Sequence, residues 1–214
     1  MDVVEIVKYS IEKCGCNSMQ ITGGSAYNSK KEYLKSINNH IGRENIKGDI
    51  LLYITPPEDF NIIDEYFDLG ASKVACSLEL WDEELAKSVT PGKIEITTRK
   101  RPLDVLEYIA NKYGPGKAFS NFIIGIEPFE TLKEGATYLA QRGVIPTASI
   151  WMPMGRPVNG SMQTPDIEYY RNVKELFANL YKEYNLEPSK CCGLNVCMEM
   201  DIYNYSKTEN ISLC

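Results

Sequence analysis

The chain has 214 residues, enough for one domain with its own hydrophobic core and short for a complete eight-stranded barrel. Hydrophobic residues make up 43% and charged residues 24%, a balance typical of soluble proteins, and the net charge of −6 argues against a nucleic-acid partner bound through phosphates. No apolar run reaches the ~20 residues needed to span a bilayer, and the first residues lack a secretory signal pattern, so we expect a cytoplasmic protein with no membrane partner.

Helical and strand patterns alternate along the chain. The predicted helices are 2–13, 30–41, 60–69, 81–88, 102–113, 129–141 and about 165–184. The predicted strands are 18–22, 50–54, 73–78, 120–126 and 145–151, and 90–93 is predicted as a turn. Five strands separated by helices imply right-handed crossovers and one parallel sheet, which is an α/β fold.

Short polar or glycine-rich segments follow four of these strands. They contain Gly23, Gly24 and Ser25, then Ser77 and Glu79, then Gly125 and Glu127, and finally Ile150, Trp151 and Met152. In a parallel sheet the carboxyl ends of the strands form one rim, and ligands bind along that rim. The sequence therefore predicts an extended ligand site at this end of the sheet.

Each segment suits a ligand, and each also has a plainer interpretation. Glycines let the backbone approach a ligand closely, although many turns after strands contain two of them. The Glu79 carboxylate could accept hydrogen bonds from a ribose or an amino group, or simply favour the start of the next helix. Trp151 and Met152 could pack against an adenine or belong to the core.

The cysteine and histidine content restricts the chemistry. Seven cysteines, an odd number without regular disulfide spacing, favour a reducing compartment. The single histidine, His40, argues against histidine-rich zinc sites and a Ser-His-acid triad. Cys191, Cys192 and Cys197 are candidate metal ligands, and the alternative is a set of free thiols.

Taken in order, these segments resemble the radical S-adenosylmethionine superfamily, in its biotin-synthase-like branch. The resemblance covers about residues 16–153 and includes the stretches Ser77-Leu78-Glu79-Leu80-Trp81-Asp82 and Asn121-Phe122-Ile123-Ile124-Gly125-Ile126-Glu127-Pro128. It implies that S-adenosylmethionine binds at the rim. The methionyl amino group would lie at Gly23, Gly24 and Ser25, the ribose or carboxylate at Ser77 and Glu79, and the glycine motif at Gly125 and Glu127, with the adenine near Ile150, Trp151 and Met152.

The chain departs from the family pattern at Ser25, where the family usually has an acid, at Glu127, which is displaced from the usual spacing, and most severely at its cysteines. The Cys-x3-Cys-x2-Cys loop, whose thiolates hold a [4Fe-4S] cluster, is absent, and Cys14 and Cys16 offer only two thiols. The resemblance thus implies a partial TIM barrel of (β/α)6 type that lacks its first βα unit. We expect a truncated barrel over 1–187 and a cysteine-containing tail over 188–214.

The resulting expectation is a domain that binds S-adenosylmethionine. When complete, such a domain would generate a 5′-deoxyadenosyl radical and act on a small-molecule substrate, a step that this chain alone would not perform. The alternatives are a non-catalytic nucleoside-binding or partner-binding module and a protein that binds metal through its tail cysteines. An exposed strand at 18–22 would also invite self-association or a partner.

Overall fold

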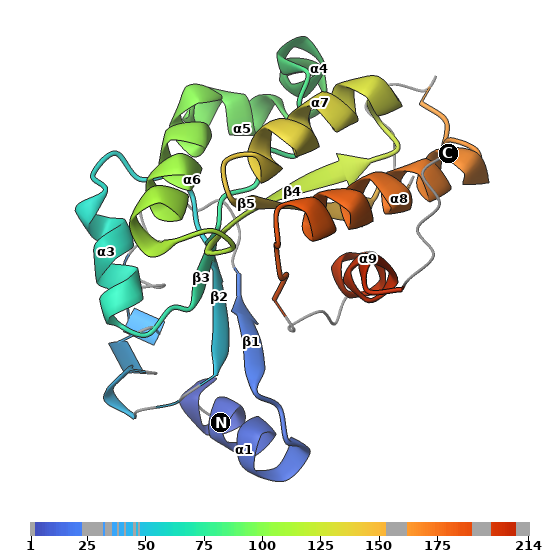
Figure 1. The fold of residues 1–214 in the computed structure, drawn as a ribbon. Coiled ribbons are helices and arrows are strands. Elements are labelled where there is room, and N and C mark those ends of the chain that lie inside the picture. Colours follow the sequence, from blue (N-terminus) through green and yellow to red (C-terminus); the bar gives the residue numbers. More distant parts are fainter. Residues whose placement is uncertain are drawn as a thin grey trace.

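The computed structural model describes residues 3–22, 32, 36–37, 39–40, 42–44, 46, 48–152, 162–189 and 198–208. Its strands are β1 (Ser18–Ile21), β2 (Asp49–Tyr53), β3 (Lys73–Ala75), β4 (Ala118–Ile124) and β5 (Val144–Ile150). They form a single parallel sheet whose spatial order, β1-β2-β3-β4-β5, follows the chain (Figure 1). The predicted α/β class with five parallel strands is therefore confirmed.

The described helices are α1 (Val3–Cys14), α3 (Asn61–Asp68), α4 (Glu83–Val89), α5 (Pro91–Ile96), α6 (Lys100–Tyr113), α7 (Phe129–Ala140), α8 (Ile167–Glu183) and α9 (Glu199–Ser206). Of these, α3 to α7 lie in the crossovers between strands, whereas α1 precedes β1 and α8 and α9 follow β5. Most residues of the predicted helix 30–41 lie outside the described ranges. The predicted turn at 90–93 is wrong, because Pro91 begins α5: its fixed φ suits the first helical turn, where its missing N–H is not needed. Among the described helices, none is long and apolar enough to cross a membrane.

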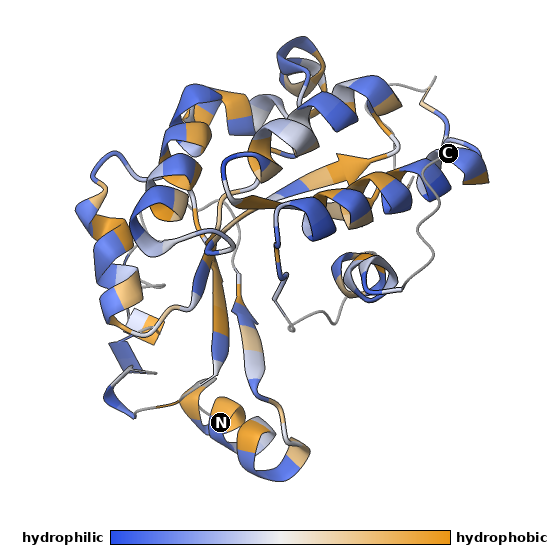
Figure 2. Ribbon diagram, in the orientation of Figure 1, coloured by the Kyte–Doolittle hydropathy of each residue, from blue (hydrophilic) through white to orange (hydrophobic). Residues whose placement is uncertain are grey.

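The two faces of the sheet differ in polarity. One face packs against α6, α7 and α8, and apolar residues concentrate along the strands and the facing helix surfaces (Figures 1 and 2). Its fully buried strand residues include Ile50, Leu52, Val74, Phe122, Ile124 and Ala148, and the facing helices contribute Leu106, Ile109, Leu132 and Phe177. The opposite face is mixed: the register places Asn121 beside Thr147 there, together with buried apolar residues such as Leu51, Phe119 and Ile145.

The free edge of β5 is covered by the C-terminal part of the chain. Pro146 has no N–H, and its carbonyl accepts a hydrogen bond from the Tyr181 hydroxyl at 2.6 Å. The N–H of Met198, just before α9, donates to the carbonyl of Ala148 at 3.1 Å. The fully buried Ile202 joins α9 to the core beneath α8 (Figure 1). These two hydrogen bonds occupy part of the row of backbone carbonyls on β5 that would otherwise be open for pairing with another strand. The domain boundary at 187 remains a prediction.

The opposite edge of the sheet is β1, and α1 lies at its foot (Figure 1). All four residues of β1 are half-buried. On α1, Ile6 and Tyr9 expose 48% and 59% of their surface, and Lys8 forms an ion pair with Glu44. Among the described residues, no strand pairs with β1 on its outer side. Association through this edge stays a prediction.

Asp64 ties α3 to α6. Its carboxylate accepts hydrogen bonds from the hydroxyls of Tyr108 at 2.8 Å and Tyr113 at 2.6 Å, and from the Lys112 ammonium at 2.7 Å. The hydrogen bond from Lys112, followed by those from the tyrosines, lowers the pKa of Asp64 below 3.8. The stabilisation is therefore present above the unfolded-state pKa and is lost as the pH falls through the lower folded-state value.

We predict that Asp64→Asn lowers the free energy of unfolding by about 1 kcal/mol at pH 7 and by much less at pH 3. Urea unfolding at the two pH values measures this difference. Asp68→Asn, at an exposed position on the same helix, is the control and should change little at either pH. An equal loss for Asp64→Asn at both pH values would contradict the interpretation.

Glu199, the first residue of α9, is a buried acid. Only 6% of its surface is exposed, and its Oε2 has no hydrogen-bond partner among the described residues. Burial raises the pKa of Glu199 above 4.5, because a desolvated charge is costly. The folded state then holds the proton more tightly than the unfolded state, so stability is lost as the pH rises from 4.5 through the folded-state pKa.

Glu199→Gln is expected to increase the free energy of unfolding at pH 8 by about 1 kcal/mol and to have little effect near pH 4. Thermal unfolding followed by circular dichroism across this pH range is the measurement. The exposed Glu187→Gln should show no such trend. If Glu199→Gln destabilises the protein most at pH 8, the carboxylate has a partner and the argument is wrong.

Candidate ligand-binding site

A bulge at the end of β3 places Glu79 on the rim. The N–H of Cys76 donates to the carbonyl of Phe119 at 2.9 Å, and the N–H of Glu79 donates to the carbonyl of Asn121 at 3.0 Å. Between these two hydrogen bonds the chain after β3 advances three residues while β4 advances two. The intervening N–H of Leu78 donates instead to the Ser120 hydroxyl at 3.0 Å. Such a bulge bends the strand and redirects the next side chain, and it ends β3 earlier than the predicted 73–78.

The backbone of Glu79 is strained and firmly held. Its φ of +70° lies in the left-handed region, which costs a residue other than glycine about 1 kcal/mol. The surrounding sheet compensates for this, because Glu79 also accepts a hydrogen bond from the N–H of Ile123 at 2.8 Å. Strained residues held in this way concentrate at functional sites.

The Glu79 side chain has one partner on each oxygen. Lys93, from α5, donates to Oε1 at 2.7 Å, and the Asn121 amide donates to Oε2 at 3.4 Å. About a fifth of the Glu79 side chain and a third of the Lys93 side chain remain exposed. A carboxylate has about four acceptor positions, so Glu79 keeps capacity for hydrogen-bond donors of a ligand.

Glu79 and Ser77 line a hollow of about 180 Å³ at the carboxyl ends of the first three strands. Its described lining also includes Thr22 after β1, Tyr53 and Thr55 from the end of β2, and residues of α5. The rim predicted from the sequence is thus real at these strands, and Ser77 and Glu79 lie together on it.

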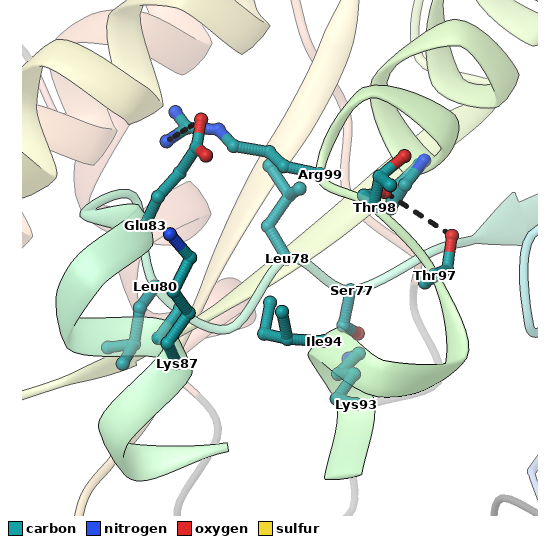
Figure 3. A pocket seen from close by; sticks show the side chains of 12 residues that line it. Ser77, Leu78, Leu80, Glu83, Lys87, Lys93, Ile94, Thr97, Thr98 and Arg99 are labelled. Atoms are coloured by element: carbon teal, nitrogen blue, oxygen red, sulfur yellow. Dashed lines mark hydrogen bonds and ion pairs between the residues drawn. The ribbon is translucent and has the colours of Figure 1, made fainter. Parts of the chain in front are cut away.

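A second hollow of about 170 Å³ lies on the other side of Ser77, between α4 and α5 (Figure 3). Its walls are largely apolar and include Leu78, Leu80 and Ile94, with Arg99 at its margin. Ser77 also lines the first hollow, as do Lys93 and Thr97. The short helix α5 therefore borders both hollows.

Glu127 lies in the interior. Its carboxylate is 3% exposed and accepts hydrogen bonds from the backbone N–H groups of Trp81, at 2.9 and 3.1 Å, and of Asp82, at 3.1 Å. Burial raises its pKa above 4.5, although these N–H groups act in the opposite direction. In this structure Glu127 holds the segment that leads from the rim into α4.

Gly125 is covered by residues at the start of α8. It has a φ of +99°, and a Cβ added there would lie 3.0 Å from the Tyr170 hydroxyl and 3.3 Å from Pro165. Its N–H donates to the Tyr169 hydroxyl at 3.2 Å. The atoms that lie closest to Gly125 belong to side chains of the same protein, and a ligand contact at Gly125 stays a prediction.

The three residues predicted near an adenine follow the end of the sheet. Ile150 is the last residue of β5, and the N–H of Trp151 continues the ladder to Ile124 at 2.9 Å. Both side chains are half-buried, whereas Met152 is 46% exposed. None of the three is among the described residues that line the two hollows.

Two groups of predicted residues lie outside the described ranges. They are the proposed methionyl contacts Gly23, Gly24 and Ser25 and the proposed metal ligands Cys191, Cys192 and Cys197.

Within the described residues, no three His, Cys, Asp or Glu side chains are grouped so that they could hold a metal ion. Cys14 and Cys16 are exposed near the amino end of β1, opposite the rim, and Cys76 is buried in the wall of the first hollow. The described residues therefore do not fit a [4Fe-4S] cluster, which needs three thiolates at one place.

The sequence analysis missed Lys93 and the role of Asn121. Lys93 stood in a predicted turn, so its helix and its partner were not expected. A signal for Asn121 was present, because an amide within an apolar strand needs a hydrogen-bond partner. That this partner is Glu79 depends on the bulge, which the sequence did not reveal.

No family model matches the chain. Over 190 residues it is 25% identical to a bacteriochlorophyllide c C-7(1)-hydroxylase of Chlorobaculum limnaeum, a match that covers 84% of this chain and 47% of that protein. Over 159 residues it is 26% identical to a probable GTP 3',8-cyclase of Methanococcus aeolicus, with 72% and 49% covered. The chain therefore spans about half the length of these curated relatives.

Among solved structures, the chain is similar to the Elp3 protein of Methanocaldococcus infernus with an N-terminal deletion. The TM-score is 0.50 at 13% identity, and the match covers 92% of this chain and 56% of Elp3. At this identity the likeness concerns the fold alone, and it agrees with the parallel sheet. The two sequence relatives support the resemblance to the radical S-adenosylmethionine superfamily, and the structural likeness agrees with its fold.

Proposed function

We propose that this chain binds S-adenosylmethionine at the carboxyl rim of its sheet, with Glu79 accepting hydrogen bonds from the ribose hydroxyls or the amino group. The observation that supports this most directly is the bulge, which holds Glu79 in a strained backbone conformation and places it in the wall of the first hollow. Ser77 and Thr22 line the same hollow and can add hydroxyl contacts.

The residues at the site fit part of this ligand. A hollow of about 180 Å³ is smaller than typical drug-sized pockets and suits one portion of the molecule, such as the ribose. The carboxylate, the hydroxyls and the backbone groups after three strands are suited to polyhydroxylated or amino groups. The apolar walls of the second hollow, which shares Ser77, offer space for a less polar portion.

The family chemistry beyond binding needs an iron-sulfur cluster, which supplies the electron for cleavage of the cofactor. The described residues do not offer its three thiolates together, and the sequence contains no Cys-x3-Cys-x2-Cys motif. We therefore propose binding without cleavage for this polypeptide by itself.

Isothermal calorimetry with S-adenosylmethionine, in the absence of iron, tests the binding. We expect Glu79→Ala to weaken the affinity about tenfold or more, because a hydrogen bond to a carboxylate contributes about 1.5–3 kcal/mol. Glu84→Ala, on α4 with 84% of its side chain exposed, is the control and should bind as the wild type does. No heat with the wild type, or equal affinities for wild type and Glu79→Ala, would refute the proposal.

Catalysis is tested separately. After anaerobic reconstitution with iron and sulfide, the isolated chain should release no 5′-deoxyadenosine above background. Sustained release would show that the missing cluster ligands are supplied in another way.

A further inference from the structure

Behind Glu79, on the face of the sheet that carries Asn121, lies a chain of hydrogen bonds that the proposed ligand contacts do not include. The hydroxyl of Ser149 donates to the Oδ1 atom of Asn121 at 2.9 Å, and the hydroxyl of Thr147 donates to the same atom at 3.3 Å. The Nδ2 group of Asn121 in turn donates to Glu79 at 3.4 Å. The chain thus runs from β5 through β4 to the rim.

The Glu79 carboxylate determines which way the Asn121 amide faces. An ionised carboxylate accepts hydrogen bonds and cannot donate them, so the amide nitrogen must face it and the amide oxygen must face away. The oxygen then needs donors, which the two hydroxyls on β5 provide. Thr147 is 1% exposed, so its hydroxyl is bound within the protein and not to bulk water. The Thr147 hydroxyl also lies 3.5 Å from the carbonyl oxygen of Ser120, so the Ser149 hydroxyl at 2.9 Å is the firmer donor to Asn121.

The two partners of Glu79 differ in rigidity. Lys93 is a long, flexible cation on the short helix α5, none of whose residues is buried. Asn121 is held by its own strand and by two hydroxyls of the neighbouring strand. Asn121 does not line either hollow, whereas Glu79 and Lys93 line the first.

We infer that Asn121, oriented by Thr147 and Ser149, is a positioning residue that holds the Glu79 carboxylate for the ligand. It acts only through Glu79, since it does not reach the hollow. This inference rests on the proposed binding function and adds to it the residues that organise the site. Residues that orient a ligand-contacting group commonly matter nearly as much as the contact itself.

A double-mutant cycle measured by calorimetry with S-adenosylmethionine tests the inference. We expect Asn121→Ala to weaken binding about fivefold when Glu79 is present and to have no effect when it is combined with Glu79→Ala. The pair Thr147→Val and Ser149→Ala should weaken binding about threefold and add nothing to Asn121→Ala. Asn111→Ala, at an exposed position on α6, is the control for amide removal. Equal effects of Asn121→Ala with and without Glu79 would overturn the inference.

A second measurement does not depend on the ligand. In the NMR spectrum of the ligand-free protein, the side-chain NH₂ signals of Asn121 should shift strongly in Glu79→Ala and in Ser149→Ala, and should stay unchanged in Glu84→Ala. If the wild type binds no S-adenosylmethionine, the proposed function fails. The Asn121 signals would still show whether the hydrogen-bond chain to Glu79 exists. Signals that do not respond to Glu79→Ala would overturn the positioning role.

Discussion

The geometry of the rim depends on one buried carboxylate. Glu127, from the segment between β4 and α7, accepts the backbone N–H groups of Trp81 and Asp82, which directly follow the bulge. Without these bonds the buried N–H of Trp81 would lose its partner, a cost of about 1–3 kcal/mol. The turn carries Ser77 and Glu79 on one side and α4 on the other, so Glu127 connects the loop that carries Glu79 to the core.

Packing around Trp81 reinforces this connection. The indole is 8% exposed, the Arg99 guanidinium lies 3.9 Å from its ring centroid, and Gly135 of α7 packs closely against the ring. A side chain at Gly135 would meet the indole at 2.6 Å, so the glycine is required for the close approach. A charged group buried by hydrogen bonds and an aromatic ring buried by packing together keep the loop in one conformation.

Two separate polar networks lie on the face of the sheet that carries Asn121, one near each end of the strands. Near the amino ends of the strands, Lys73 pairs with Asp49 at 3.2 Å, and the Ser189 hydroxyl donates to the same carboxylate at 2.8 Å. This network links the sheet to the C-terminal part of the chain. Near the carboxyl ends, the Asn121 network leads to Glu79 and the hollow. Both networks lie on one face because side chains alternate along each strand and the register aligns these positions, while the parallel direction keeps the two networks at opposite ends of the sheet.

The sequence by itself determined the order and type of most elements, because hydrophobic periodicity is a local property that survives without tertiary context. It also placed Ser77 and Glu79 on the rim, since both follow a buried strand. The tertiary structure decided what these residues contact. The bulge arises only where β3 meets β4, and Lys93 reaches Glu79 only because Pro91 begins a helix. Glu127 and Gly125 show the same limit: their partners lie about 45 residues away in the chain, and pairs so distant are set by how the units pack together.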